Sequence, residues 1–412
     1  MKKMLTLLLP IVFLPMCIGC GAVDRSDKVV IWEQMDPREQ DLLDRHIESF
    51  ILAHPQYSDI KITRAHYNVE DLRTQFQTAA LAYGGPNLVY GPSDQIGPFS
   101  IMELVEPLEN ILPDSVLSRF DKTELPILNN HIYGIPDQIG NHLTLVANLD
   151  LIDELPTNSD QWVEQLKALT IDKDNNGRPE QFGLVFNMAE PFWLVPFLGG
   201  YGGWVMDVFG KPTLHSEAMT GALEFMLGLK TSGVVPRECD YPLADTLFKE
   251  GRAAYIINGP WSWDGYRSAG LNIKLLPIPM ISETGLWPTP MTSAKCYSVN
   301  KYLHPDTREC TIALLIWLTS AKIQEDLCLE LGILPSDLET RKRADLLENE
   351  LLADSRTQID KGKLMPIVPE MRAIWDSMRP AYQNCLNGEL SPADASKQMQ
   401  QRAIKMITRM HE

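Results

Sequence analysis

The sequence predicts an α/β protein built from two lobes. At 412 residues the chain is longer than one hydrophobic core usually serves. Strand-like and helix-like segments alternate between residues 28 and 90, which is typical of a sheet whose successive strands run parallel. The alternation resumes in the middle of the chain, and from residue 307 onward nearly every segment has a helical pattern. We therefore expect each lobe to hold a mixed, mostly parallel sheet flanked by helices, with a hinge between the lobes.

The first lobe is expected to begin with strand, helix, strand, helix and strand. Asp36 and Pro37 are typical of a helix start, since Asp caps the first turn and Pro fits the first helical position. Apolar residues then recur at three- and four-residue spacing, which indicates an amphipathic helix. The predicted strands are 28–32, 60–62 and 88–90, and the predicted helices are 38–53 and 69–82.

Later segments predict the second lobe and the crossovers. Residues 272–279 form a strand pattern that runs into Pro277-Ile278-Pro279, a composition suited to a crossover between lobes. Further predicted elements are strands at 183–186 and 253–257 and helices at 216–231 and 243–250. The expected division is 27–139 and 280–330 in lobe I, with 140–279 and 331–412 in lobe II.

The N-terminus has the layout of a secretory signal. Lys2 and Lys3 precede a short apolar run that is too short to span a bilayer comfortably. Gly19-Cys20-Gly21 follows and looks like a bacterial lipobox, although Cys17 stands where Leu is usual. We expect a signal peptide at 1–19 and a lipid-anchored linker at 20–27, with the lipid on Cys20. Cleavage without lipidation is the alternative.

Charge and cysteine usage exclude several functions. The chain carries 37 basic and 54 acidic residues, a net charge of −17, and therefore lacks the basic surface that nucleic-acid binding needs. The five cysteines after the signal are scattered without a CxxC pair. This pattern favours buried free thiols over a disulfide framework or a zinc site.

Patterns of catalytic residues are missing from the sequence. There is no GxSxG, HExxH or GxxxxGKS/T motif, and the eight histidines are dispersed. We therefore expect a protein that is not an enzyme and uses no cofactor. Paired carboxylates could still meet in space, as in a glycosidase.

One loop resembles the start of a calcium loop. Asp172, Asp174 and Asn176 offer oxygen ligands at alternate positions, and Gly177 stands sixth. The twelfth position, where a bidentate Glu is expected, is Gly183. A polar turn is the favoured interpretation, with calcium as the weaker candidate.

Tryptophans in stretches rich in Gly and Pro point to a sugar site. A flat aromatic ring fits the apolar face of a sugar, while carboxylates, amides and Arg bond its hydroxyl groups. Packing between lobes is the alternative role for such rings. The tryptophans concerned are Trp193, Trp204, Trp261, Trp263 and Trp287.

At Asn258-Gly259-Pro260-Trp261-Ser262-Trp263 the chain resembles the bacterial extracellular solute-binding proteins that include the maltose/maltodextrin-binding protein. Similar stretches extend over nearly the whole mature chain, among them Tyr133-Gly134-Ile135-Pro136 and Phe248-Lys249-Glu250-Gly251-Arg252. The resemblance implies a type II periplasmic-binding-protein fold whose lobes close around a ligand. It also implies a membrane permease and its ATPase as partners, and a monomeric protein.

Matching positions supply the candidate ligand contacts. The resemblance places Asp36 and Asp94 in the first lobe, and Asn141 near a hinge position. Gly91, Gln95 and Pro37 depart from the maltose binder's pattern, so maltose itself is in doubt, and Glu33 with Gln34 is expected to take over part of the first-lobe role. The remaining candidates are Glu190, Phe192, Trp193, Tyr241, Trp261, Trp263, Trp375 and Arg379.

We expect the ligand to be a neutral di- or oligosaccharide. A phosphate-bearing ligand would need Arg or Lys at the site, and Arg379 is the one such residue among the candidates. A polyol or glycerophosphodiester binder on the same fold is the alternative, followed by an exported glycoside-acting enzyme.

Overall fold

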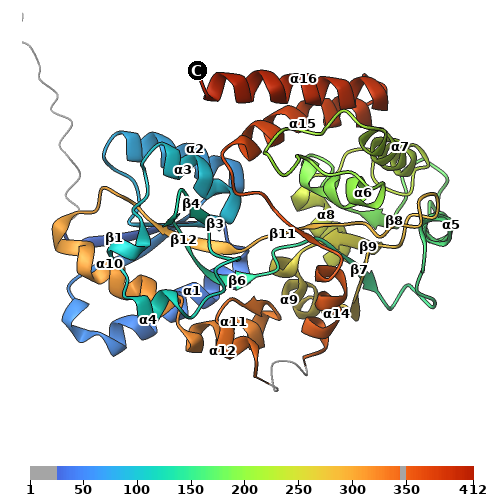
Figure 1. The fold of residues 1–412 in the computed structure, drawn as a ribbon. Helices are drawn as coiled ribbons and strands as arrows, with labels where there is room; N and C mark the ends of the chain where they lie inside the picture. Colours follow the sequence, from blue (N-terminus) through green and yellow to red (C-terminus); the bar gives the residue numbers. More distant parts are fainter. Residues whose placement is uncertain (1–25, 344–348) are drawn as a thin grey trace, which may run out of the picture.

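The computed structural model describes residues 26–343 and 349–412, and it divides into two lobes as expected (Figure 1). The predicted signal peptide and Cys20 lie outside these residues. No helix within the described part of the chain is long and apolar enough to cross a membrane.

Lobe I is built on a six-stranded sheet in the order β13-β6-β12-β3-β1-β2. Its first half contains β1 (Lys28–Glu33), α1 (Pro37–Ala53), β2 (Lys61–His66), α2 (Val69–Leu81), β3 (Leu88–Pro92), α3 (Ile96–Ile101), α4 (Asp114–Leu117), β4 (Ile127–Leu128), β5 (His131–Ile132) and β6 (Ile135–Ile139). Its second half contains β12 (Lys295–Val299), α10 (Pro305–Leu318), α11 (Ala321–Leu331), β13 (Leu334–Pro335) and α12 (Leu338–Arg341).

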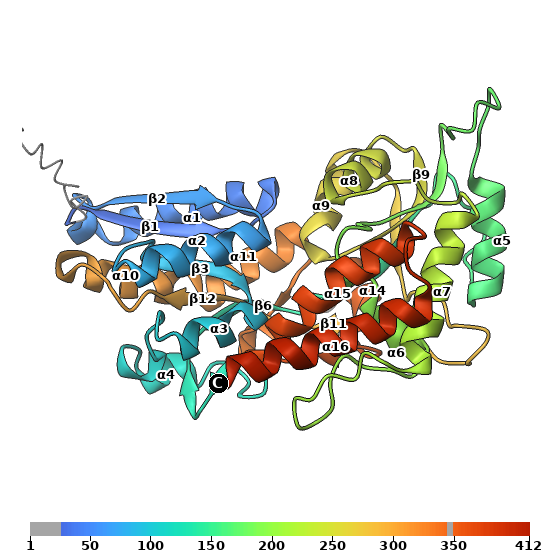
Figure 2. The ribbon, with the colours of Figure 1, turned by 90° about the horizontal axis from the view of Figure 1, so that it is seen from above.

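Lobe II is built on a four-stranded sheet in the order β10-β7-β9-β8. It contains β7 (Thr144–Asn148), α5 (Ser159–Leu169), β8 (Phe182–Val185), α6 (Val195–Gly200), α7 (Glu217–Thr231), α8 (Tyr241–Lys249), β9 (Ala253–Asn258), α9 (Pro260–Ser268), β10 (Ile273–Leu276), α14 (Glu350–Ile359), α15 (Glu370–Leu386) and α16 (Pro392–Met410). Helices α15 and α16 lie side by side and run in opposite directions: α15 runs from the interlobe region into lobe II, and α16 runs back toward lobe I (Figures 1 and 2).

The expectation of mostly parallel sheets is wrong. Parallel pairing is found between β1 and β2, β1 and β3, and β8 and β9. The other pairings in the two sheets are antiparallel. The difference has a topological cause. Consecutive strand-helix-strand units give the parallel pairs, whereas β12 and β13 enter the first sheet after the chain has returned from lobe II.

Two of the predicted domain boundaries also move. Ile281 and Met291, expected in lobe I, are buried in the core of lobe II. Leu331 and Ile333, expected in lobe II, pack against Leu42 of lobe I. The crossover at 291–295 is buried or half-buried along its length, so no exposed linker marks where the chain re-enters lobe I.

The hinge is tied by hydrogen bonds between two crossovers. Asn141 follows β6 on the way to lobe II, and Ser293 precedes β12 on the way back. The amide N–H of Asn141 donates to Ser293 O at 2.9 Å, and its Nδ2 donates to Ser293 Oγ at 3.0 Å. Beside them, β11 (Met291–Thr292) pairs in parallel with β14 (Lys363–Leu364). The segment that enters α15 is thereby fixed against the hinge.

The five cysteines after the signal are all buried, as the sequence predicts. Burial raises the pKa of each of the four thiols of Cys239, Cys296, Cys310 and Cys385. A raised thiol pKa lowers the thiolate fraction, so these side chains are packing groups.

Candidate functional site

The N-terminus of α1 brings one candidate carboxylate to lobe II. Asp36 precedes the first helical residue, and its Oδ2 accepts a hydrogen bond from Tyr241 Oη at 2.9 Å. Tyr241 Oη in turn accepts from Trp261 Nε1 at 2.9 Å. Lys295 Nζ lies 5.6 Å from the centre of the Trp261 ring, within the range of a cation–π contact. Three of the predicted residues therefore form one chain of contacts across the two lobes.

Burial shifts the pKa of the Asp36 carboxyl group. Desolvation, followed by the nearby charge of Glu39, raises the pKa of Asp36 to about 6, against the opposing effects of Lys295 and Tyr241. Lys295 forms a buried ion pair with Glu39, with its Nζ at 2.9 and 3.1 Å from the two carboxylate oxygens. This pair fixes the first turn of α1, because Glu39 Oε2 also accepts the Asp36 amide at 3.1 Å.

A second interlobe contact joins Asp94 to Trp375. Asp94 lies in a single helical turn directly after β3, at the C-terminal end of this strand, and is half-buried. Trp375 Nε1 on α15 donates to Asp94 Oδ2 at 3.1 Å. The ring of Phe192 stands edge-on to that of Trp375, with centroids 6.2 Å apart. Desolvation raises the pKa of Asp94 to about 6.

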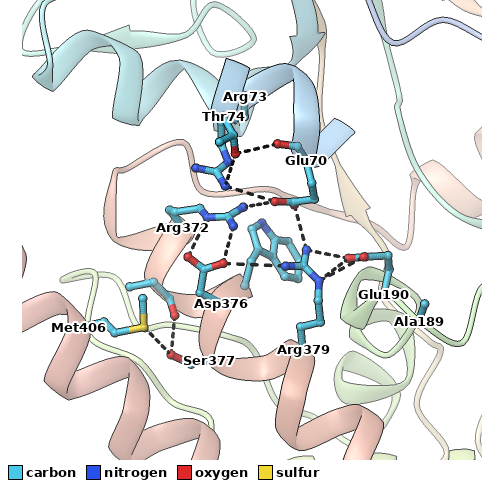
Figure 3. A network of polar contacts seen from close by, with 12 residues as sticks. Glu70, Arg73, Thr74, Ala189, Glu190, Arg372, Asp376, Ser377, Arg379 and Met406 are labelled. Atoms are coloured by element: carbon cyan, nitrogen blue, oxygen red, sulfur yellow. Dashed lines mark hydrogen bonds and ion pairs between the residues drawn. The ribbon is translucent and has the colours of Figure 1, made fainter. Parts of the chain in front are cut away.

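The third contact is an ionic network that we call the arginine network (Figure 3). Its central residue is Glu70, at the start of α2 in lobe I, and its other members are Arg73, Glu190, Arg372, Asp376 and Arg379. Arg372 Nη1 lies 2.7 Å from Glu70 Oε2, and Arg379 Nη2 lies 2.8 Å from Glu70 Oε1. Arg379 also reaches Glu190 at 2.8 Å, and Arg372 pairs with Asp376.

The arginines bring the pKa of Glu70 below its usual value, but not that of Glu190. Burial alone would raise the pKa of Glu70, but the guanidinium charges of Arg372 and Arg379 outweigh it and hold this pKa below its usual range. Burial raises the pKa of Glu190, and Arg379 only partly offsets this effect. The interlobe ion pairs of Glu70 are made by arginines of α15, the helix that also carries the candidate sugar contact Trp375.

Sequence reasoning missed Glu70 and Arg372. A signal for Arg372 was present, because it is placed one turn before Asp376 and two turns before Arg379 on the helix that carries Trp375. Glu70 gave no such signal, since an acidic residue in a first helical turn is ordinarily explained by the helix dipole.

Other candidates lie in the protein core. Trp263 is fully buried and packs within lobe II, with its ring centre 5.8 Å from that of His142. Trp193 is 6% exposed, and its Nε1 donates to Ile257 O at 2.8 Å. Of the two aromatic residues after Glu190-Pro191, Phe192 is the one that reaches Trp375.

Glu33 is a core residue as well. Its carboxylate is fully buried, accepts the Met35 amide at 2.6 Å and faces Arg64 Nη1 at 3.1 Å. The structure therefore moves Glu33 from the ligand contacts to the support of β1. The reason is geometric: Glu33 is the last residue of β1 and points inward, as Val29 and Ile31 do.

The Asp172 loop has the hydrogen bonds of a polar turn. Asp172 Oδ2 accepts from the Gly177 amide at 2.8 Å, and Glu180 Oε2 accepts from the Lys173 amide at 2.8 Å. Oxygens of Asp172, Asp174 and Glu180 lie within 4.8 Å of one another. The loop projects from lobe II between α5 and β8, away from lobe I (Figure 2). Calcium binding here stays a prediction.

A close backbone approach sits beside these contacts. Gly97 of α3 is packed so tightly that a Cβ atom would come within 2.3 Å of Ile367 O. Ile367 lies between Met365 and Val368, which pack on the core of lobe II. Gly97 therefore marks a point of direct backbone contact between the lobes.

Comparison with known proteins agrees with this arrangement. Residues 53–353 match the family described as bacterial extracellular solute-binding protein. The maltose/maltodextrin-binding domain of Bdellovibrio bacteriovorus, solved with maltotriose, is 38% identical, with a TM-score of 0.89 and coverage of 92% of this chain and 100% of that one.

Two curated relatives are more distant. The maltotriose-binding protein of Pyrococcus abyssi is 24% identical over 89% of this chain and 78% of its own. The galactooligosaccharide-binding protein of Bacillus subtilis is 24% identical over 94% of this chain and 91% of its own. These relatives are binding proteins by name, and they agree with a protein that is not an enzyme.

Proposed function

The chain belongs to the family of bacterial extracellular solute-binding proteins, and from this premise we propose that it is the substrate-binding component of an ABC-type carbohydrate importer. It binds a neutral, maltose-like oligosaccharide between its lobes and delivers it to a membrane permease that works with an ATPase. The relatives named for maltotriose and galactooligosaccharide support this class of ligand.

The facing aromatic and carboxylate groups carry this proposal. Trp261, Trp375 and Phe192 come from lobe II, while Asp36 and Asp94 come from lobe I. Aromatic rings stack on sugar faces, and carboxylates accept hydrogen bonds from sugar hydroxyls. Because the two kinds of group come from different lobes, a ligand that contacts both favours the closed arrangement.

The remaining site candidates have distinct roles. Tyr241 positions Asp36 and Trp261, because its hydroxyl group is bonded to both. Glu190 and Arg379 hold each other at the edge of the site. Asn141 acts at the hinge through its hydrogen bond to Ser293.

A thermal-shift screen of the protein tests the ligand class. Maltotriose, a galactooligosaccharide, a polyol and a glycerophosphodiester are compared at equal concentration. A ligand that binds the folded state raises Tm in proportion to RT ln(1 + [L]/Kd). We expect a shift with a neutral oligosaccharide that mass spectrometry recovers intact. A shift with the glycerophosphodiester alone would overturn the sugar assignment, and a cleaved sugar would overturn the binding role.

The protein is proposed to be exported and anchored by a lipid on Cys20, and to act as a monomer. In cells, Cys20→Ser should move the protein from the membrane fraction to the soluble fraction, because one lipidated cysteine is the sole proposed anchor. An unchanged distribution would contradict the lipid anchor and leave the sugar assignment untouched.

A further inference from the structure

The arginine network places three arginines between the lobes and balances them with three carboxylates. The cationic members are Arg73, Arg372 and Arg379, and the anionic members are Glu70, Glu190 and Asp376. The three arginine side chains are 15–22% exposed, so solvent screens them only in part. As a group, these six residues add no net charge to the interlobe site.

Glu70 is the one carboxylate of this network that comes from lobe I. Glu190 and Asp376 belong to lobe II and travel with the arginines of α15. Glu70 Oε2 accepts from Arg372 Nη1 at 2.7 Å, and Oε1 accepts from Arg379 Nη2 at 2.8 Å. With Arg73 Nη2 at 3.3 Å from Oε2, a single carboxylate therefore occupies donors of three guanidinium groups, which is the position that an anionic ligand group would take.

We propose that Glu70 is a specificity-determining residue, which keeps the arginine network electrically neutral and thereby excludes anionic solutes. The inference rests on the proposed function as a binder of neutral sugars. Its physical basis is competition. A phosphate or carboxylate entering the site meets arginines whose donors are already bonded, and it also meets the negative charge of Glu70.

Removing this charge should convert the site into an anion binder. In Glu70→Gln the network carries two carboxylates and three guanidinium groups, and Arg372 Nη1 loses its charged partner. Inorganic phosphate is the probe, because it reaches the arginines without depending on where a sugar lies. Titration calorimetry at pH 7 and low ionic strength should show phosphate binding at least tenfold tighter in Glu70→Gln than in the unaltered protein.

Matched variants separate charge from structure. Glu103→Gln removes a lobe I carboxylate whose partner is Lys301, and it should leave phosphate affinity unchanged. Glu70→Asp keeps the charge and should show no gain. Glu70→Ala removes the carboxylate without adding an amide, and it serves as a second variant should Glu70→Gln fail to fold. Adding Arg372→Gln to Glu70→Gln should cancel the gain.

The outcomes are distinct. Folded Glu70→Gln and Glu70→Ala proteins whose phosphate affinity stays within twofold of the unaltered protein would overturn the inference. A gain that persists after Arg372→Gln and Arg379→Gln are added would overturn it as well. Maltotriose titrated into the unaltered protein tests the proposed function separately: no binding of any neutral sugar there would count against that function, whatever Glu70→Gln does.

Discussion

Two tryptophans that are two residues apart should respond in opposite ways to the same substitution. Trp263 is fully buried in lobe II, while Trp261 is partly exposed and bonded to Tyr241. We expect Trp263→Ala to lower the free energy of unfolding by ~3–5 kcal/mol, the cost of an indole-sized cavity in a packed core. The folded fraction should keep its affinity for the sugar, because Trp263 reaches no surface that a ligand could contact.

Trp261→Ala should show the reverse pattern. It removes a stacking surface, so binding should weaken by ~1–3 kcal/mol, about 5- to 160-fold in Kd. Its cost in stability should be near that of one hydrogen bond, ~0.5–1.5 kcal/mol, since the ring is only partly buried. Titration calorimetry with maltotriose measures the change in binding, and urea unfolding measures the change in stability.

Trp263→Phe is the matched control. Within the described residues, the buried Nε1 of Trp263 has no hydrogen-bond partner, so phenylalanine removes an unsatisfied donor as well as some volume. We expect it to cost less than about 2 kcal/mol. The reasoning is refuted if Trp263→Phe weakens maltotriose binding tenfold while stability is retained, or if Trp261→Ala binds maltotriose as the unaltered protein does.

Three further predictions concern charge and reactivity. Lys295→Met should destabilise the protein by ~3–5 kcal/mol, measured by urea unfolding, because it leaves the buried Glu39 carboxylate unpaired; Lys295→Met with Glu39→Leu should recover most of this loss. The pKa of Asp94 is raised from 3.8 to about 6, so the folded state binds more protons than the unfolded state between these values, and the carboxyl's contribution to stability is full below pH 3.8 and is lost as pH rises through 6. Asp94→Asn should therefore be more stable than the unaltered protein at pH 7 but not at pH 3.5, and equal stabilities at pH 7 would contradict the raised pKa. The five buried thiols should react with a thiol reagent only upon unfolding, and rapid labelling of the native protein would contradict their burial.

The order of elements could be predicted from sequence because local patterns determine it. Apolar spacing and the Asp36-Pro37 start placed α1 within a residue of its observed range, and buried apolar runs placed β3 and β9. Strand direction could not be predicted in this way. The partners of β12 are decided by a crossover from the other lobe, which no local pattern records.

Only part of the candidate site could be predicted from the sequence. Trp261 and Trp263 share the same Gly- and Pro-containing motif, yet the turn into α9 sends one ring toward Tyr241 and the other into the core. Helical phase across two residues makes this difference, and composition cannot reveal it. Glu70 could not be predicted for another reason, because its ion pairs form only where α2 and α15 meet in the folded protein.

Gly97 sets how near the two lobes can come. At that point the backbone of α3 meets the chain entering α15, with room for a hydrogen atom but not for a carbon atom. Alanine at this position would push the two backbones apart, and the separation of the lobes would increase with distance from the hinge. The affinity for a sugar thus depends on Gly97, which has no side chain that could contact a ligand. The size of the residue at position 97 can therefore change the affinity for a ligand between the lobes, while the residues that contact the ligand stay the same.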